Sequence, residues 1–254
     1  MKAAILEKLD SPLIVKNIDS LPLQKGQVLV KLAYSGVCHS QLMEVRGKRG
    51  VDQYLPHLLG HEGSGIVIEI GEGVEKVKPG DRVILGWIKG HGLDSGGTKY
   101  KLNDHFINSG SVTTFNEYSV VSENRCTLLP DGIPMDIAVL FGCAIPTGAG
   151  IVINTIQPHK DSTIAIFGLG GIGLSALMAT MLYKCSKIIA IDVQEDKLKL
   201  AKDMGATHII NALEGDPIKT IKKITCGEFV DYSVESAGLS KTIEQAFNSI
   251  KRNG

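Results

Sequence analysis

The stretch "STIAIFGLGGIGLSALMATMLYKC", residues 162–185, decides the fold of the second half of the chain. Its first part, "TIAIFG", is a continuous apolar run, as expected of a strand buried on both faces of a parallel sheet. Gly168, Gly170 and Gly173 follow in the order G-x-G-x-x-G, directly before a segment of helical length. A glycine-rich turn between a buried strand and a helix predicts a strand–helix–strand unit here.

The chain continues this alternation after residue 185. Further apolar runs occur at "KIIAID", "THIIN" and "FVDYSVE", and charged segments with helical spacing separate them. Strands that alternate with helices imply right-handed crossovers and a parallel sheet. We count four strands, whereas a complete dinucleotide-binding sheet has about six. We therefore expect an incomplete Rossmann-type, doubly wound parallel sheet over residues 147–254.

The first half of the chain has a different pattern. Short alternating runs such as "QVLVKLAYSGV", "GIVIEIG", "DRVILGW" and "NEYSVVSE" are separated by glycine and proline. Short strands at this spacing predict an antiparallel, barrel-like β domain. We place this domain at residues 1–146, so the predicted fold class is α/β plus β.

The composition limits the classes of protein to which the chain can belong. Of its 254 residues 43% are hydrophobic and 21% charged, and Lys+Arg equals Asp+Glu at 27 each, which favours packed domains and indicates no nucleic-acid partner. The N-terminus has no signal-peptide core and no apolar run approaches the roughly 18 residues that cross a bilayer, so we expect no membrane partner. Five scattered cysteines suit a cytoplasmic protein with reduced thiols or metal ligands.

Asp192 extends the glycine pattern into a dinucleotide-binding fingerprint. It ends the second apolar run, 19 residues after Gly173. A carboxylate at this distance can accept hydrogen bonds from ribose hydroxyls and repels a 2′-phosphate, so NAD is favoured over NADP. The start of the helix offers backbone N–H groups to the pyrophosphate. The alternative is a glycine-rich turn without a cofactor beside a solvated aspartate.

A second unusual stretch, "LLGHEGSGIVIEIG" (residues 58–71), combines two ionisable residues with several glycines. Glycine weakens a strand because it costs entropy and has no side chain to pack, so this composition indicates a function other than strand formation. Cys38 and Cys143 could join His61 as ligands, because two thiolates and an imidazole with an open fourth position form a catalytic zinc arrangement. These residues lie far apart in the sequence, so each cysteine could also be a small buried packing residue.

Several motifs together resemble the zinc-containing alcohol dehydrogenase family of the medium-chain dehydrogenase/reductase superfamily. They are "GVCHS" (36–40), "GHEGSGIVIEIGEGV" (60–74), "KPGDRV" (78–83), "GCAIPTG" (142–148), "GLGGIG" (168–173) and "DKLKLAKDMGATHIIN" (196–211). The resemblance implies a GroES-like catalytic domain followed by a Rossmann NAD-binding domain. It also implies hydride transfer between NAD and a primary or secondary alcohol, polyols and sugar-derived alcohols included, to give an aldehyde or ketone.

The resemblance implies roles for particular residues. Cys38, His61 and Cys143 match the ligands of one catalytic zinc, and Glu62 matches a carboxylate beside the metal that assists ligand exchange. Ser40 matches the hydroxyl that takes the substrate proton. Cofactor-binding positions match Gly168, Gly170, Gly171, Gly173, Asp192 and Lys197. Without the resemblance Lys197 would be only an exposed helix cation, and His39 is expected either to contact the pyrophosphate or to be solvated.

The chain departs from the family pattern at several positions. Gln41 stands where the family usually has an aspartate that orients the ligating histidine, and Met43 stands where some relatives have a histidine that completes a proton relay. Residues 86–118 contain no cysteine, which excludes the four-cysteine structural zinc of many relatives. Three residues there, His91, Asp94 and His105, could form an oxygen/nitrogen site or simply a polar surface loop. Trp87 and His91 could line the substrate cleft.

The chain also ends before the fifth strand and the C-terminal return to the first domain that the family has, so we expect a C-terminally truncated form. A full-length form is expected to be a homo-oligomer. The sequence leaves two other functions open. One is a zinc-free enzyme similar to the quinone reductases of the same superfamily, and the other is a non-catalytic remnant that binds NAD or zinc without turnover.

Overall fold

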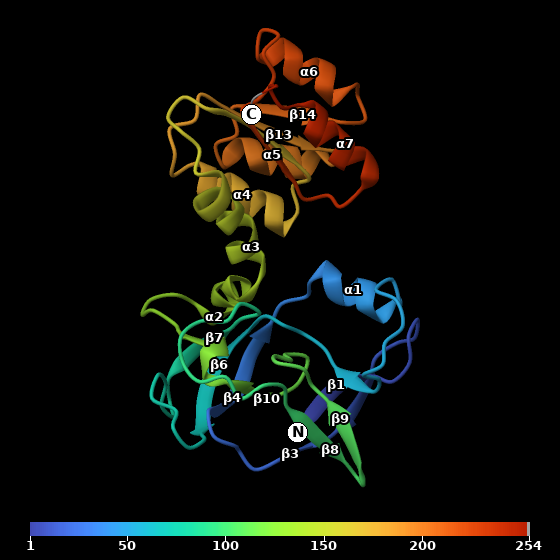
Figure 1. Cartoon of the computed structure of the whole chain (residues 1–254), viewed down its shortest axis with the longest axis vertical. Helices are drawn as coiled ribbons and strands as arrows, with labels where there is room; N and C mark the ends of the chain where they lie inside the picture. Colours follow the sequence, from blue (N-terminus) through green and yellow to red (C-terminus); the bar gives the residue numbers. More distant parts are fainter. Residues whose placement is uncertain (253–254) are drawn as a thin grey trace. The chain divides into compact units, whose positions relative to one another are not determined.

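The computed structural model describes residues 1–252. These residues form two compact units, of which the first ends at Cys143 and the second begins at Ala144. The boundary between them precedes by three residues the one expected from the sequence, after residue 146. The first unit is built of strands and the second of strands and helices in alternation (Figure 1). The predicted fold class, a β domain followed by a partial parallel sheet, is confirmed.

The first unit contains two sheets. The six-stranded sheet has the order β2-β1-β5-β9-β8-β3, and the five-stranded sheet has the order β10-β4-β6-β7-β11. Every pairing is antiparallel except that of β5 with β9. The strands are β1 (Lys2–Leu6), β2 (Ile14–Asn17), β3 (Asp19–Ser20), β4 (Gln27–Ser35), β5 (His57–Leu58), β6 (Gly63–Ile70), β7 (Arg82–Leu85), β8 (Lys99–Leu102), β9 (His105–Asn108), β10 (Tyr118–Ser122) and β11 (Cys126–Leu128).

Short helical segments connect these strands. They are α1 (His39–Val45), η1 (Glu123–Arg125), α2 (Met135–Ala138) and η2 (Val139–Gly142). Alternate residues of β4 point into the core, where Val28 and Val30 are fully buried beside Val67 and Leu85. This alternation is what the period-two sequence pattern predicts for a strand with one buried face.

The second unit contains a parallel sheet with the order β14-β13-β12-β15. Its strands and helices are α3 (Ala144–Gly150), η3 (Ile151–Ile156), β12 (Thr163–Phe167), α4 (Gly171–Thr180), β13 (Lys187–Asp192), α5 (Glu195–Asp203), β14 (His208–Asn211), α6 (Pro217–Ile224), β15 (Tyr232–Glu235) and α7 (Ser240–Asn248).

All five residues of β12 are buried because helices cover both faces of this sheet. Ile164 and Ile166 pack in one core cluster with Leu177 of α4, whereas Ala165 and Phe167 pack in a second cluster on the other face. The second cluster includes residues of α6 and α7. A strand buried on both sides has no reason to alternate, which explains the continuous apolar run in the sequence.

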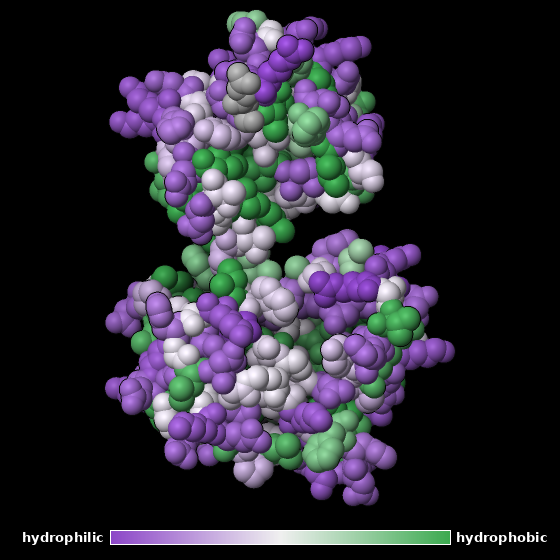
Figure 2. Space-filling view, viewed as in Figure 1, coloured by the Kyte–Doolittle hydropathy of each residue, from purple (hydrophilic) through white to green (hydrophobic). Residues whose placement is uncertain are grey.

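The exposed surface is mixed in polarity. Hydrophilic and hydrophobic residues are interspersed on the face of each unit that Figure 2 shows. Among residues 1–252 no single helix is both long and apolar enough to cross a membrane. Only the interrupted pair Met135–Gly142 and Ala144–Ile156, taken together, reaches that length and composition.

Candidate metal centre and dinucleotide-binding turn

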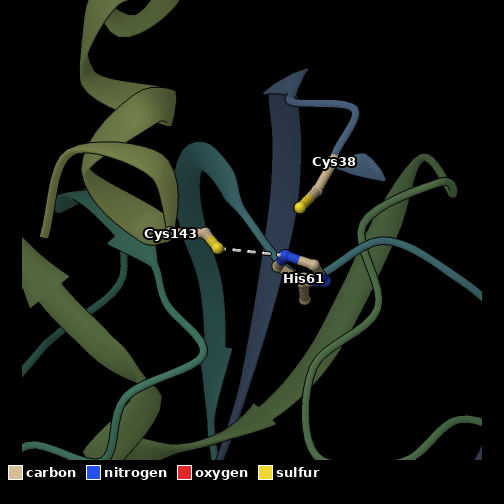
Figure 3. Close-up of side chains that lie close together, drawn as sticks. All are labelled: Cys38, His61 and Cys143. Carbon is tan, nitrogen blue, oxygen red and sulfur yellow. Dashed lines mark hydrogen bonds between the residues drawn. The ribbon is translucent and has the colours of Figure 1, made fainter. Parts of the chain in front are cut away.

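Cys38, His61 and Cys143 lie together in the first unit. Their ligand atoms are all within 4.8 Å of one another, and the Nε2 atom of His61 is 3.2 Å from the Sγ atom of Cys143. Figure 3 shows the three side chains pointing toward a common centre from three separate segments. Each residue is half-buried. The structure therefore brings together three residues that are distant in the sequence.

The register of three neighbouring strands explains this convergence. Ser35, at the end of β4, pairs with Gly63 at the start of β6, and Gly63 pairs with Leu85 at the end of β7. Cys38 lies just beyond the end of β4, and His61 just precedes β6. The third segment is fixed because the backbone N–H of Trp87, which follows β7, donates to the carbonyl of Gly142, next to Cys143. One edge of one sheet thus presents all three side chains.

Two glycines allow the cysteine-bearing segments to close around Glu62, which is only 3% exposed. A Cβ atom on Gly36 would lie 2.3 Å from the Oε1 atom of Glu62, and one on Gly142 would lie 2.4 Å from the carbonyl oxygen of Leu85. Side chains at either position would separate Glu62 from the cysteine segments. Glu62 is not one of the three residues whose ligand atoms cluster, so its role as a metal ligand stays a prediction.

Gln41 of α1 contacts two of the three segments. The backbone N–H of Cys38 donates to its Oε1 atom at 2.8 Å, and its Nε2 atom lies 3.0 Å from the Nδ1 atom of His61. The side chain is 3% exposed. Gln41 therefore occupies the position of a residue that orients the imidazole, with its amide nitrogen rather than its oxygen toward the ring.

The surroundings of His61 favour a neutral imidazole. Burial lowers the pKa of His61, and the positive charge of Arg49 lowers it further. A neutral ring is the form that a metal requires. The ring of Trp87, which is 61% exposed, lies 6.0 Å from the His61 ring, centroid to centroid.

The donor set fits zinc. Zinc binds thiolate sulfur at about 2.3 Å and imidazole nitrogen at about 2.0 Å, which places the ligand atoms of a tetrahedral site roughly 3.5–3.8 Å apart. The spacing of the three donors here requires only small side-chain adjustments to reach this arrangement. Three protein ligands leave a fourth position for a substrate oxygen.

The remaining predicted residues of the first unit lie on α1, next to this cluster. His39 is exposed at the first position of the helix, and Ser40 is half-buried one residue later. Met43 is 37% exposed. The predicted roles of His39 and Ser40 stay predictions.

The second unit contains the glycine-rich turn that the sequence indicated. Gly168 has a φ of +87°, and a Cβ atom on Gly173 would lie 1.8 Å from the carbonyl oxygen of Gly168. A Cβ atom on Gly170 would have no neighbour within 4 Å. The turn is thus closed at its two outer glycines and open at the middle one, directly before α4 begins at Gly171.

This turn fits a dinucleotide pyrophosphate. The turn follows β12, where the strand order reverses: β13 and β14 lie on one side of β12, and β15 lies on the other. Ligands of doubly wound sheets bind at the carboxyl ends of the strands at such a reversal. The open space at Gly170 lets backbone N–H groups approach an anion at the helix start. The residues present therefore fit the predicted cofactor.

Asp192 is tied to the turn by hydrogen bonds that the sequence did not indicate. Its Oδ2 atom accepts from the N–H of Leu169 at 2.7 Å, and its Oδ1 atom accepts from Val193 and Gln194. A carboxylate has about four acceptor sites, so capacity for a ribose hydroxyl remains. Lys197 lies half-buried on α5, and its contact with a cofactor stays a prediction.

The sequence indicated neither of two further groups of contacts, one at the turn and one in the first unit. Ser236 donates from Oγ to the carbonyl of Gly168 at 2.8 Å and so fastens the turn. In the first unit His57 is buried, with Nε2 2.8 Å from Oδ2 of Asp52 and 3.9 Å from Oε1 of Glu44. The only signal for the second group is the position of His57 four residues before His61.

The segment that lacks cysteines is held by a carboxylate. Glu123 is 3% exposed and accepts from the N–H groups of Glu75, Lys76 and Leu93 at 2.6–2.7 Å. In the part of the chain that the structure describes, His91, Asp94 and His105 are not among the clusters that could hold a metal.

Two family models and several relatives match the chain. Residues 24–131 match the family model of the alcohol dehydrogenase GroES-like domain, and residues 171–254 match that of the zinc-binding dehydrogenases. The chain is 34% identical to S-(hydroxymethyl)glutathione dehydrogenase of Synechocystis over 99% of this chain and 75% of that protein. It is 36% identical to alcohol dehydrogenase class-3 of Dictyostelium discoideum over 93% of this chain and 70% of that protein.

Solved structures agree in fold. Benzyl alcohol dehydrogenase of Acinetobacter calcoaceticus is 30% identical and superposes with a TM-score of 0.89, covering 100% of this chain and 75% of that one. A zinc-dependent alcohol dehydrogenase 2 of Streptococcus pneumonia in its apo form is 26% identical, with a TM-score of 0.84 and coverage of 100% and 74%. This chain is shorter than these relatives.

Three clustered residues that could hold a metal in an antiparallel unit, followed by a glycine-rich turn in a parallel unit, fit a zinc- and nucleotide-dependent dehydrogenase. The chain belongs to the zinc-containing alcohol dehydrogenase family of the medium-chain dehydrogenases. Its activity is zinc-dependent oxidoreduction of alcohols with NAD, and both the predicted family and the predicted enzyme class are confirmed.

Proposed function

We propose that Cys38, His61 and Cys143 hold one catalytic zinc and that the protein has no structural four-cysteine zinc. The observation that carries this proposal is the convergence of the three ligand atoms within 4.8 Å. The second half of the proposal is supported by the sequence, since residues 86–118 contain no cysteine. In their place the Glu123 carboxylate holds the neighbouring loops.

Bound zinc acts as a Lewis acid that favours loss of the alcohol proton near neutral pH, and NAD accepts the hydride. We propose that the Ser40 hydroxyl takes the substrate proton. Met43 cannot carry this proton further, so Ser40 passes it to water or to a ribose hydroxyl. Gly168, Gly170, Gly171 and Gly173 cradle the pyrophosphate, and Asp192 accepts from the ribose.

The substrate is a small alcohol or the corresponding carbonyl compound. Trp87 offers an exposed aromatic face 6.0 Å from the His61 ring, which suits an alcohol with an apolar or aromatic substituent. Benzyl alcohol and S-(hydroxymethyl)glutathione are the two probes that the names of similar proteins suggest. None of the five cysteines, all of which lie within the described residues, forms a disulfide, and we propose the reducing cytoplasmic compartment expected from the sequence. Homo-oligomerisation of a full-length form stays a prediction.

Metal analysis and NADH absorbance test the proposal together. One zinc per chain, lost in Cys38→Ser, with NAD reduction by at least one alcohol, is the expected result. Equal zinc content in the wild type and in Cys38→Ser would contradict the ligand assignment. Turnover without any bound zinc would favour the enzyme similar to quinone reductases, and NAD binding without turnover would favour the non-catalytic alternative.

A further inference from the structure

Gln41 is the buried side chain that joins two of the three metal-ligand segments. Its single amide faces two nitrogen atoms, the backbone nitrogen of Cys38 at 2.8 Å and Nδ1 of His61 at 3.0 Å. An amide has one accepting oxygen and one donating nitrogen. Because the oxygen faces one neighbour and the nitrogen the other, the amide in this geometry satisfies both only if one of them donates and the other accepts.

The two neighbours meet this condition as long as Nδ1 of His61 carries no proton. The N–H of Cys38 donates to Oε1, and the amide nitrogen donates to an unprotonated Nδ1 of His61. The ring proton then lies on Nε2, which faces Sγ of Cys143 at 3.2 Å. Every polar group in this chain of contacts has a complementary partner.

The condition fails once His61 binds a metal through Nε2, the atom that faces the sulfur ligands. A neutral imidazole with a metal on one nitrogen carries its proton on the other, so Nδ1 becomes a donor. The N–H of Cys38 is always a donor. Rotation of the Gln41 amide by half a turn only exchanges which of the two donors faces the amide nitrogen. In either orientation one pair of donors opposes each other within 3.0 Å.

We infer that Gln41 is a positioning residue whose amide weakens zinc binding, and that a carboxylate of the same length would strengthen it. The inference rests on the proposed function, because it takes Cys38, His61 and Cys143 as the zinc ligands. Gln41→Glu keeps the shape of the side chain and supplies two acceptors, one for the N–H of Cys38 and one for the Nδ1–H of His61. Partners of ligating histidines typically change metal affinity about 10–100-fold.

The same substitution has the opposite effect on the metal-free protein. Gln41 is 3% exposed, and a carboxylate buried without a metal-bound partner loses its hydration. The metal-free Gln41→Glu protein therefore melts at a lower temperature than the wild type, while its zinc complex is tighter. If Gln41 served only in packing, Gln41→Glu would lower both the melting temperature of the metal-free protein and its affinity for zinc.

Competition with a chelating zinc indicator tests the inference on the full chain. Gln41→Glu is expected to lower the zinc dissociation constant about 10–100-fold, and Gln41→Met, which pairs with neither neighbour, to raise it about 10-fold. Leu42→Glu, which adds the same charge at the neighbouring position, where the side chain is 39% exposed, is the matched control and is expected to stay within about three-fold of the wild type.

A dissociation constant of Gln41→Glu equal to or above that of the wild type overturns the inference, and so does an equal gain in Leu42→Glu. If metal-free Gln41→Glu does not fold, the rate of zinc release from the loaded protein into excess chelator is measured instead of the dissociation constant. A release rate equal to that of the wild type overturns the inference. Cys38→Ser distinguishes the two proposals. If it binds zinc as tightly as the wild type, the ligand assignment fails, whereas loss of binding in Cys38→Ser without a gain in Gln41→Glu refutes only the role of Gln41.

Discussion

The Nε2 atom of His61 lies 3.2 Å from the Sγ atom of Cys143, although 82 residues separate the two along the chain. The contact depends on the pairing of Gly63 with Leu85 and on the hydrogen bond from Trp87 to Gly142. Strand pairing therefore brings these two proposed zinc ligands together. Binding of zinc then requires little reordering of the backbone, which lowers its entropic cost.

Cys143→Ser is expected to lose zinc while keeping the fold. A hydroxyl is a poor zinc ligand compared with a thiolate, so the affinity should fall by more than about 100-fold. Cys143 is half-buried, and serine has nearly its size, so the far-ultraviolet circular dichroism should not change. Metal analysis after dialysis measures the zinc content. Cys226→Ser, at an exposed cysteine of the second unit, is the control, and equal zinc content in both variants would contradict the assignment.

Ser40→Ala is expected to lower kcat without loss of zinc. General acid–base groups typically contribute about 10²–10⁴-fold to a rate, and here no histidine at position 43 can substitute. Because Ser40 is not one of the clustered ligands, zinc content should be that of the wild type. Steady-state NADH absorbance gives kcat. Unchanged kcat at saturating alcohol, with normal zinc, would show that another group takes the proton.

The fold of the second unit could be predicted from the sequence because its signals are local. Burial of β12 on both faces produces a continuous apolar run, and the turn after it needs glycines at 168 and 173 for steric reasons. The pairing of Asp192 with Leu169 could not be predicted, since a carboxylate at the end of a strand has the same sequence whether it binds ribose, backbone or both.

From the residues alone the metal cluster was one of two alternatives, and the family resemblance was needed to favour it. Nothing in the spacing of Cys38, His61 and Cys143 specifies their distance, which depends on strand register. Glu123 was missed for a related reason. It lies in the segment "SENR" without any periodic signal, and its three backbone partners come from two loops about 30 and 47 residues away in the sequence.

Gly170→Ala is expected to weaken NAD binding without a change in stability. A Cβ atom at Gly170 contacts nothing within 4 Å, and φ there is −78°, which alanine adopts without strain. The methyl group would instead occupy the space that the pyrophosphate needs, so we expect at least about a 10-fold rise in the NAD dissociation constant, a cost of about 1.4 kcal/mol. Isothermal titration calorimetry and thermal unfolding measure the two quantities.

Gly215→Ala is the matched control for this prediction, because a Cβ atom there also contacts nothing within 4 Å. It should change neither melting temperature nor NAD affinity. Gly173→Ala should lower both, since its Cβ atom would lie 1.8 Å from a backbone oxygen. NAD affinity of Gly170→Ala equal to that of the wild type would place the pyrophosphate elsewhere.

Glu123 is expected to make the stability of the first unit depend on acid pH. Burial alone would raise the pKa of this carboxyl, but hydrogen bonds from the N–H groups of Leu93, Lys76 and Glu75 outweigh burial and hold the pKa below its ordinary value. A depressed pKa in the folded state means that the stabilisation is complete above the unfolded pKa of about 4.3 and is lost as the pH falls through the folded value. The window therefore lies below about pH 4.3.

Glu123→Gln should lower the free energy of unfolding at pH 7 by about 2 kcal/mol, because the amide nitrogen would face a backbone donor and leave it unpaired. As the pH falls from 5 to below about 4.3, the variant should also lose less stability than the wild type, since its side chain does not titrate. Urea unfolding at several pH values measures both effects, with Glu69→Gln at an exposed position of β6 as the control. If the acid dependence of Glu123→Gln equals that of the wild type, other carboxylates must account for it, and the hydrogen bonds of Glu123 would then fix the loops near Trp87 only through their geometry.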